Sequence, residues 1–188
     1  MGVYAYIRKA FQKQTKEELQ KKLIVWRREE STVRLDHPTR IDRARNLGYK
    51  AKQGYFVVRQ RVPRGGHYRP HYRNGKKPRR NTSRMVLDIS YRRIAEMRVA
   101  RKYKNCEVLN SYYVAKDGQY YWHEVIMVDK AHPSILNDKK ISWIARPAHN
   151  GRVFRGLTSA GRKGRALQKK GKGVEKARPS QAAHRNRL

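Results

Sequence analysis

Residues 106–129 constrain the fold more than any other stretch, because they predict a β-hairpin. They read CEVLNSYYVAKDGQYYWHEVIMVD, two strand-like runs joined by Asp117-Gly118, a pair suited to a two-residue turn. Such a turn sets Lys116 opposite Gln119 and fixes the register of the hairpin, which is expected to span about residues 106–128. One face would pair Tyr113 with Trp122 and Leu109 with Ile126, and the other Val114 with Tyr121, Tyr112 with His123 and Val108 with Met127. Both faces are largely apolar, so one should be core and the other covered by a helix, which predicts an α+β fold.

One further strand and one further helix should pack on this hairpin. Residues 54–62, GYFVVRQRV, alternate with the period of a strand. Apolar residues at positions 87, 91 and 94 have helical spacing and predict a helix that runs to about Tyr103. We therefore expect a small antiparallel sheet with the hairpin at its centre and helices packed on it.

The first fifty residues have a helical pattern. Apolar residues at positions 3, 7 and 11 predict a first helix, and Thr15 with Glu18 predicts a capping box at the start of a second. A third, short helix is expected in residues 37–48, with Thr39 as its cap and Gly48 at its end.

These elements divide the chain into three expected parts. Residues 1–53 form the N-terminal helices, residues 54–148 an α+β core with a basic loop at 63–83, and residues 149–188 a basic extension. Apolar periodicity fades after Pro147, so we expect the extension to be too polar to bury a core. It would be disordered, or ordered by what it binds.

Positive charge is concentrated in two runs. The chain carries 47 Lys and Arg against 14 Asp and Glu, a formal net charge of +33. No acid lies between Asp42 and Asp88, where there are fourteen Lys and Arg, and only Glu175 is acidic among the fifty residues from Lys139 to the end. Solvated surfaces usually mix signs, whereas a phosphate backbone favours acid-free basic surfaces. A nucleic acid is the expected partner, and a membrane surface is disfavoured because neither run is an amphipathic helix.

The segment RGLTSAGRKGRAL, residues 155–167, resembles a nucleotide-binding glycine loop at first sight. An NTPase loop needs a hydroxyl after its lysine to hold magnesium and a buried strand before it, and both are missing here. Thr158 or Ser159 should cap a short helix instead, and a helix N-terminus attracts phosphate. We interpret the segment as an anchor for polymeric phosphate, in which Gly156, Gly161 and Gly164 permit close backbone approach.

No catalytic or metal-binding constellation emerges from the sequence. The seven histidines are scattered, and the one helix-spaced pair, His67 and His71, lies in the Gly/Pro-rich loop. His123 and Glu124 are neighbours on a strand and should point to opposite faces. Cys106 is the only cysteine, with no base argued beside it. We expect that the protein is not an enzyme and that it binds no metal and no cofactor of its own. If its nucleic-acid partner is RNA, structural Mg or monovalent ions would be held by that RNA.

Three strings in the sequence resemble a known family. LGYKAKQGYFVVRQRVPRGG, EVLNSYYVAKDGQYYWHEVIMVD and RGLTSAGRKGRAL, in that order after an MGVYAYI start, are similar to blocks of the L-fifteen-e family of large-subunit ribosomal proteins. The resemblance implies a non-catalytic α+β protein of the cytoplasmic ribosome whose basic loops and tail penetrate ribosomal RNA. It implies RNA contacts at the motif positions Tyr49, Lys50, Lys52, Arg64, Arg155, Arg162 and Lys163.

The resulting hypothesis is a structural constituent of the large ribosomal subunit that stabilises folded ribosomal RNA by charge neutralisation and shape recognition. Its partners would be that RNA and neighbouring ribosomal proteins, with no membrane and no homo-oligomer. A non-ribosomal nucleic-acid-binding protein and an RNA-processing factor are the alternatives. The candidate RNA-binding residues are Arg43, Arg45, Tyr49, Lys50, Lys52, Arg59, Arg61, Arg64, Tyr68, Arg69, Tyr72, Arg73, Lys76, Lys77, Arg79, Arg80, Arg84, Arg152, Arg155, Thr158, Ser159, Arg162, Lys163, Arg165, Lys169 and Lys170.

Overall fold

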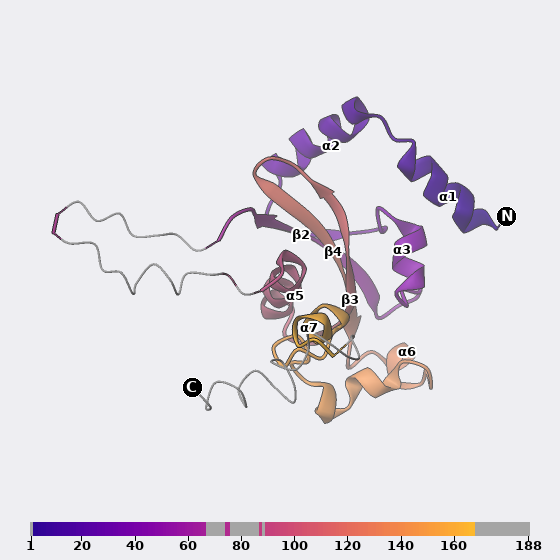
Figure 1. Cartoon of the computed structure of the whole chain (residues 1–188). Helices are drawn as coiled ribbons and strands as arrows, with labels where there is room; N and C mark the ends of the chain where they lie inside the picture. The colour runs from indigo at the N-terminus through magenta and orange to yellow at the C-terminus, as the bar shows by residue number, and fades with distance from the viewer. Residues whose placement is uncertain (1, 67–73, 76–86, 88, 168–188) are drawn as a thin grey trace.

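A four-stranded antiparallel sheet organises the protein, as the computed structural model shows for residues 2–66, 74–75, 87 and 89–167 (Figure 1). The strand order is β1-β2-β4-β3. This arrangement confirms the α+β fold. The described elements are α1 (Val3–Gln12), α2 (Lys16–Arg28), β1 (Thr32–Leu35), α3 (Ile41–Asn46), β2 (Tyr55–Pro63), α5 (Tyr91–Lys102), β3 (Cys106–Lys116), β4 (Tyr120–Asp129), α6 (Pro133–Leu136), the 3₁₀ helices η1 (Ser142–Ala145) and η2 (Pro147–His149), and α7 (Ser159–Gly164).

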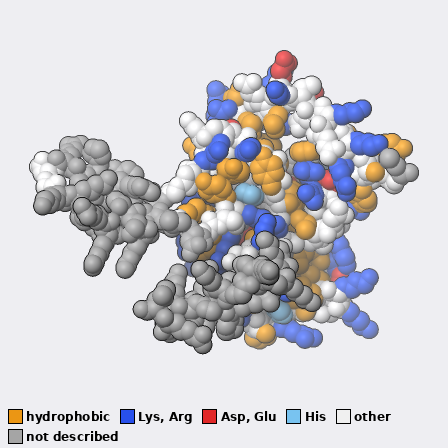
Figure 2. Space-filling model, viewed as in Figure 1, with side chains coloured by type: hydrophobic (Ala, Val, Ile, Leu, Met, Phe, Trp, Pro, Cys, Tyr) orange, Lys and Arg blue, Asp and Glu red, His pale blue; other side chains and the backbone are white. Residues whose placement is uncertain are grey.

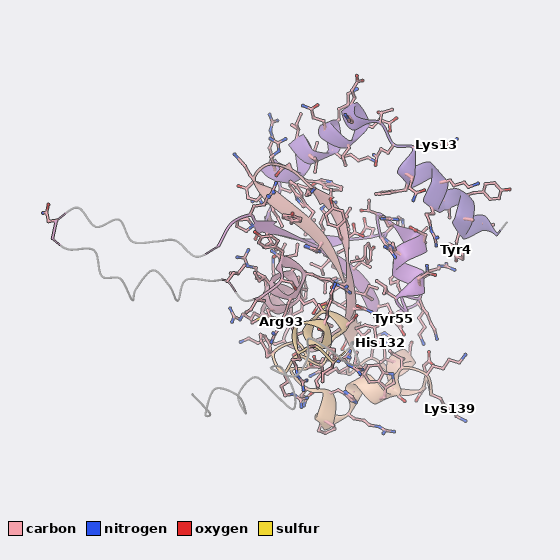
Figure 3. All side chains as sticks on the ribbon, viewed as in Figure 1. Tyr4, Lys13, Tyr55, Arg93, His132 and Lys139 are labelled. Carbon is pink, nitrogen blue, oxygen red and sulfur yellow. The ribbon has the colours of Figure 1, made fainter. Side chains whose placement is uncertain are left out.

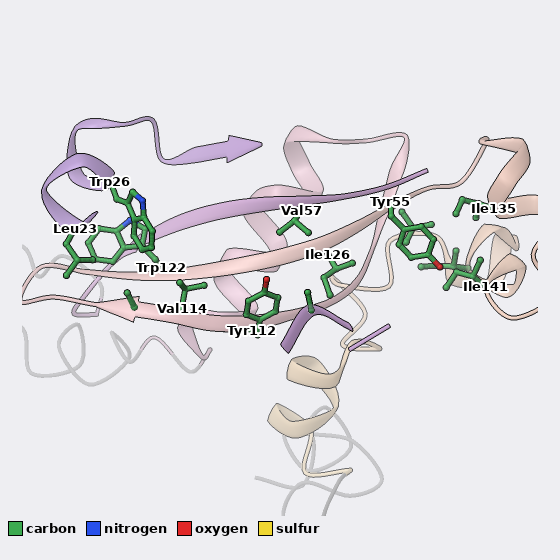
Figure 4. Packing of buried hydrophobic residues seen from close by; sticks show 14 residues of the cluster. Leu23, Trp26, Tyr55, Val57, Tyr112, Val114, Trp122, Ile126, Ile135 and Ile141 are labelled. Carbon is green, nitrogen blue, oxygen red and sulfur yellow. The ribbon is translucent and has the colours of Figure 1, made fainter. Parts of the chain in front are cut away.

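The sheet carries an apolar cluster on each face, as expected from the two apolar faces of the hairpin. On one face Trp122 and Ile126 of β4 pack with side chains from α2, α6 and η1, among them Trp26 (Figure 4). On the other face Val125 and Met127 pack against buried side chains of α5. Central strands β2 and β4 are therefore covered on both sides, which fixes the framework on which the basic segments are held.

The hairpin register differs from the prediction at most positions. Lys116 pairs with Tyr121, so the two-residue turn is Gly118-Gln119 and lies one position later than expected. The Asp117 carboxylate accepts hydrogen bonds from the Gln119 and Tyr120 amides at 2.7 and 2.5 Å, and this side-chain turn replaces the backbone turn that Asp-Gly favours. Of the six predicted pairs, only Val108 with Met127 is found.

Two bulges in β3 restore that one pair. The register shifts between Val108 and Asn110 and again between Tyr113 and Ala115, so one residue at each place has no opposite partner. Each bulge adds one residue to β3 and removes half of the displacement that the turn introduced. The unpaired residues, Leu109 and Val114, still pack in the core on the face that holds Trp122.

The N-terminal region contains a strand that the sequence analysis missed. Strand β1 pairs with β2 along four residues and forms one edge of the sheet. The Thr15–Glu18 capping box of α2 is confirmed. Thr39 is not the cap of α3: its amide donates to the buried Glu124 carboxylate at 3.1 Å, and the helix begins after Arg40 without a side-chain cap.

The segment after Pro147 is folded as far as Leu167, contrary to the expectation that it is too polar to contribute to the core. Val153 is fully buried in the cluster beneath α5, and Thr158 and Ala160 are buried as well. A handful of small and apolar side chains is sufficient here because α5 and β3 already supply most of the surface to be covered. Residues 168–188 lie outside the described part.

Candidate nucleic-acid interface

Helix α7 and the loop before it are fixed to the core by a buried polar cluster. The Thr158 hydroxyl accepts from the Gly161 amide at 3.2 Å, which confirms a capping threonine, and donates to Glu96 of α5 at 2.6 Å. The second oxygen of Glu96 accepts from Ser111 of β3 at 2.5 Å. Burial raises the pKa of the Glu96 carboxyl, against the opposing effect of these hydrogen bonds. The cluster therefore joins α5, β3 and α7 at one point.

Two glycines of the anchor segment contact each other. Gly156 has a left-handed backbone, φ +68°, and a Cβ added to Gly161 would lie 2.5 Å from the Gly156 Cα. The close backbone approach expected for phosphate is thus made within the protein at these two positions. The first turn of α7 is also buried against the core. Gly164 is different, because nothing lies within 4 Å of its Cβ position.

The basic side chains of this segment differ in what they contact. Arg162 and Lys163 are exposed on α7. Arg155 donates to the Ala148 and Asn150 carbonyls, and Arg165 donates to the Gly156 carbonyl at 3.4 Å. Arg162 and Lys163 are therefore the side chains of the anchor most available to a polyanion.

A pocket of about 460 Å³ brings α7 together with the start of α5. Arg93 lies in the first turn of α5 (Figure 3), and its Nε is buried with no hydrogen-bond partner among the described residues. Neighbouring Arg92 donates to Ser111 and Asn110 of β3, so it also has a structural role. Neither arginine is among the candidates from the sequence, because only folding places them beside α7. The pocket is lined by Ile89, Ser90, Arg92, Arg93, Ala160, Lys163, Gly164 and Arg165.

Arg59 and Arg152, two candidate RNA-binding residues, are buried and bonded within the protein. Arg59 pairs with Glu29 and lies over the Trp26 ring at 4.3 Å. Arg152 donates to the Val108 carbonyl at 2.9 Å, and burial lowers its pKa. Because both guanidinium groups stabilise the core, we leave them out of the proposed RNA surface.

The string around Tyr49 makes structural contacts with Asp138, after α6, and with Tyr55 of β2. Lys50 and Lys52 bind the Asp138 carboxylate at 2.9 and 2.7 Å, and these hydrogen bonds hold the pKa of Asp138 far below its usual value. Tyr49 packs edge-on against Tyr55. The charge of the two lysines is therefore partly neutralised before any RNA binds.

Arginines near the hairpin turn and on α3, together with Ser159, the first residue of α7, complete the described candidates. Arg64 donates to the Asp117 carbonyl at 2.7 Å and lies over the Tyr121 ring, and Arg61 donates to the Arg27 carbonyl. On α3, Arg45 donates to the Tyr4 hydroxyl at 2.8 Å, and Arg43 lies on the rim of a polar pocket between α1 and α3. Outside the described residues lie Tyr68, Arg69, Tyr72, Arg73, Lys76, Lys77, Arg79, Arg80, Arg84, Lys169 and Lys170.

The visible face of the protein has many Lys and Arg side chains and few acids (Figure 2). His123 and Glu124 point to opposite faces of the sheet: His123 stacks on Tyr121, whereas Glu124 accepts from Tyr112. Within residues 2–66, 74–75, 87 and 89–167, no three His, Cys, Asp or Glu side chains come together as a metal site. No helix in this part of the chain is long and apolar enough to span a membrane.

An α+β core that presents exposed cations on α3 and α7 is typical of a nucleic-acid-binding protein. The family model described as Ribosomal L15 matches residues 2–184, and the chain belongs to this family. It is 52% identical to large ribosomal subunit protein eL15 of Methanospirillum hungatei, over 99% of this chain and 97% of the relative. It is 49% identical to the protein of the same name from Methanocella arvoryzae, with the same coverage.

Membership of the family establishes the role of the chain. It is a structural constituent of the large ribosomal subunit and not an enzyme, and it acts in the cytoplasmic ribosome. Association with large-subunit ribosomal RNA and with ribosomal proteins follows from that place.

Proposed function

We propose that the chain stabilises folded ribosomal RNA by bringing exposed cations, held on a rigid core, against RNA phosphates. The observation that carries this proposal is the attachment of α7: its cap, Thr158, is bonded to Glu96 in the core, while Arg162 and Lys163 project outward. Cations on a fixed element lose little conformational freedom on binding, so more of their attraction for phosphate is retained.

The proposed RNA surface is narrower than the sequence suggested. Among the described candidates it consists of the exposed cations of α3 and α7, with Arg93 added from α5. The candidates of the basic loop and of the tail beyond Leu167 remain proposals based on their charge. The three-part division at residues 53 and 148 also remains a prediction, although β1, from the first part, belongs to the sheet.

The finer features of the partnership are proposals too. We propose that the chain joins the subunit as a single copy, that it does not bind membranes, and that it needs no cofactor of its own. Mg or monovalent ions near it would be ligands of the RNA.

Sedimentation of the full chain with ribosomal subunits tests the proposed function. In a sucrose gradient at moderate salt, the wild-type chain should migrate with the large subunit, and the Arg162→Gln/Lys163→Gln variant should be retained less. A Leu136→Ala variant, which changes an exposed apolar residue on α6, is the matched control and should migrate as wild type. Recovery of the wild-type chain as free protein would refute the proposal, and crosslinking to DNA in cells would favour a chromatin role.

A further inference from the structure

A second pocket, distinct from the one beside α7, lies at the far end of α5. It has a volume of about 380 Å³, within the range of small-ligand sites. Three segments form it: the end of α5 with the start of β3, the residue after β4, and the turn that follows η2. It is lined by Ala100, Arg101, Lys104, Cys106, Glu107, Lys130, Asn150, Gly151, Val153 and Phe154.

Phe154 is an aromatic side chain held in an exposed position on this pocket. It is 43% exposed, whereas its neighbour Val153 is fully buried in the core. The turn that carries it is fixed: the Phe154 amide donates to the Gly151 carbonyl at 3.0 Å, and the Gly151 amide donates to Glu107 at 2.8 Å. An exposed ring on an anchored turn retains apolar surface that a flat ligand can cover.

The rim of the pocket is positively charged. The Arg101 guanidinium lies 5.9 Å from the centre of the Phe154 ring, and Lys104 has no ion pair with any acid among the described residues. Lys130 donates to Asn150 at 3.0 Å and lies 3.6 Å from Glu107. Glu107, the only acid among the described residues that line the pocket, is 5% exposed and occupied by these contacts. An incoming group therefore meets an aromatic wall, an apolar floor and cations.

We infer that this pocket receives one unpaired nucleotide of ribosomal RNA. The base would stack on Phe154 above Ala100 and Val153, and Arg101 and Lys104 would contact the phosphates on either side. Unpaired bases stack on aromatic rings and on guanidinium planes, while phosphates take up the neighbouring cations. A purely apolar partner would leave these cations without a counterion. The inference rests on the proposed function, since it requires RNA against this face.

Ultraviolet crosslinking of intact large subunits that contain the full chain tests this inference. Peptide analysis should find a nucleotide adduct on the peptide that contains Phe154. If adducts form on the peptide that contains Arg162 and Lys163 but none forms at Phe154, the RNA-binding function stands and the nucleotide pocket is refuted. If no adduct forms anywhere on the chain, both fail. A protein–protein crosslink at the pocket would assign it to a neighbouring protein and overturn the inference.

Variants of the ring provide a second measurement. We expect Phe154→Ala to lower the affinity of the full chain for transcribed large-subunit RNA at least about fivefold, since stacking of one base contributes that much or more. Phe154→Tyr keeps the ring and should stay within about twofold of wild type. Leu136→Ala removes an exposed apolar side chain that does not line the pocket and is the control. Equal affinity of all three variants would overturn the inference, and circular dichroism of each variant checks that it is folded.

Discussion

Thr158 and Glu96, separated by 62 residues in sequence, share a hydrogen bond of 2.6 Å in the interior of the protein. Both side chains are fully buried. The same hydroxyl caps α7, so one threonine orients the helix that presents Arg162 and Lys163 and also attaches it to α5. Charge presentation at the surface thus depends on a buried hydrogen bond in the core.

Replacing Thr158 with valine should destabilise the protein by about 2 to 4 kcal/mol, because Glu96 loses a buried donor and α7 loses its cap. Thr158→Ser keeps the hydroxyl and should cost less than about 1.5 kcal/mol, the loss of one buried methyl group. Denaturant unfolding of the full chains measures both free energies of unfolding. Equal stability of the valine and serine variants would show that the hydroxyl contributes nothing.

The contact between Gly156 and Gly161 makes a second prediction. A methyl group at position 161 would meet the Gly156 backbone, which cannot move aside like a flexible side chain. We expect Gly161→Ala to destabilise the protein by about 1 to 3 kcal/mol. Gly164→Ala, three residues later on the same helix and with open space at its Cβ, should be neutral or stabilising by up to about 1 kcal/mol. Thermal unfolding of the two variants distinguishes these outcomes, and an equal loss in both would contradict the steric explanation.

Local patterns predicted the elements of the fold well, but not the exact pairing between them. Alternation correctly predicted β2 and the two strands of the hairpin, and the Thr15 capping box was confirmed. The turn was wrong because the Asp117 side chain, and not a left-handed glycine, closes it, and bulges have no signal in a simple alternating pattern. Strand β1 has only four residues, too few for a period to stand out.

The charged surface was predictable in composition but not residue by residue. An acid-free run predicts that RNA lies nearby. It cannot show which of its Lys and Arg side chains are already paired with acids elsewhere in the protein. Arg59 is paired with Glu29, and Lys52 is paired with Asp138, across 30 and 86 residues of sequence. The sequence predicted that Thr158 or Ser159 caps α7, because a cap is a local signal. The hydrogen bond between Thr158 and Glu96 was not predictable, because it depends on tertiary packing.

The buried His123 should make stability depend on pH. Burial, and to a lesser extent the charge of Arg92, lowers its pKa from 6.5 to about 4. Between these two values the unfolded chain binds more protons than the folded one, so stability falls as the pH falls from 6.5 to 4. The shift corresponds to about 3 kcal/mol.

The comparison with His123→Gln isolates this effect. Glu96 and Glu124 have raised pKa values because they are buried, and their titration acts in the opposite direction in both proteins. Denaturant unfolding at several pH values should show that wild type loses about 3 kcal/mol more than His123→Gln between pH 6.5 and 4. Parallel pH profiles would mean that the folded protein does not lower the pKa of His123.

Salt dependence of RNA binding should distinguish free cations from paired ones. Each phosphate contact contributes roughly 0.7 to 0.9 to the slope of log affinity against log salt concentration. Removing Arg162 and Lys163 together by glutamine substitution should therefore reduce the slope by about 1.4 to 1.8. Lys50→Gln should change it by less than about 0.7, because the Lys50 ammonium is already bound to Asp138 at 2.9 Å. Filter binding to transcribed large-subunit RNA over a salt series measures the slopes. A larger change for Lys50→Gln than for the double variant would mean that the main RNA contact is made near Lys50 and not on α7.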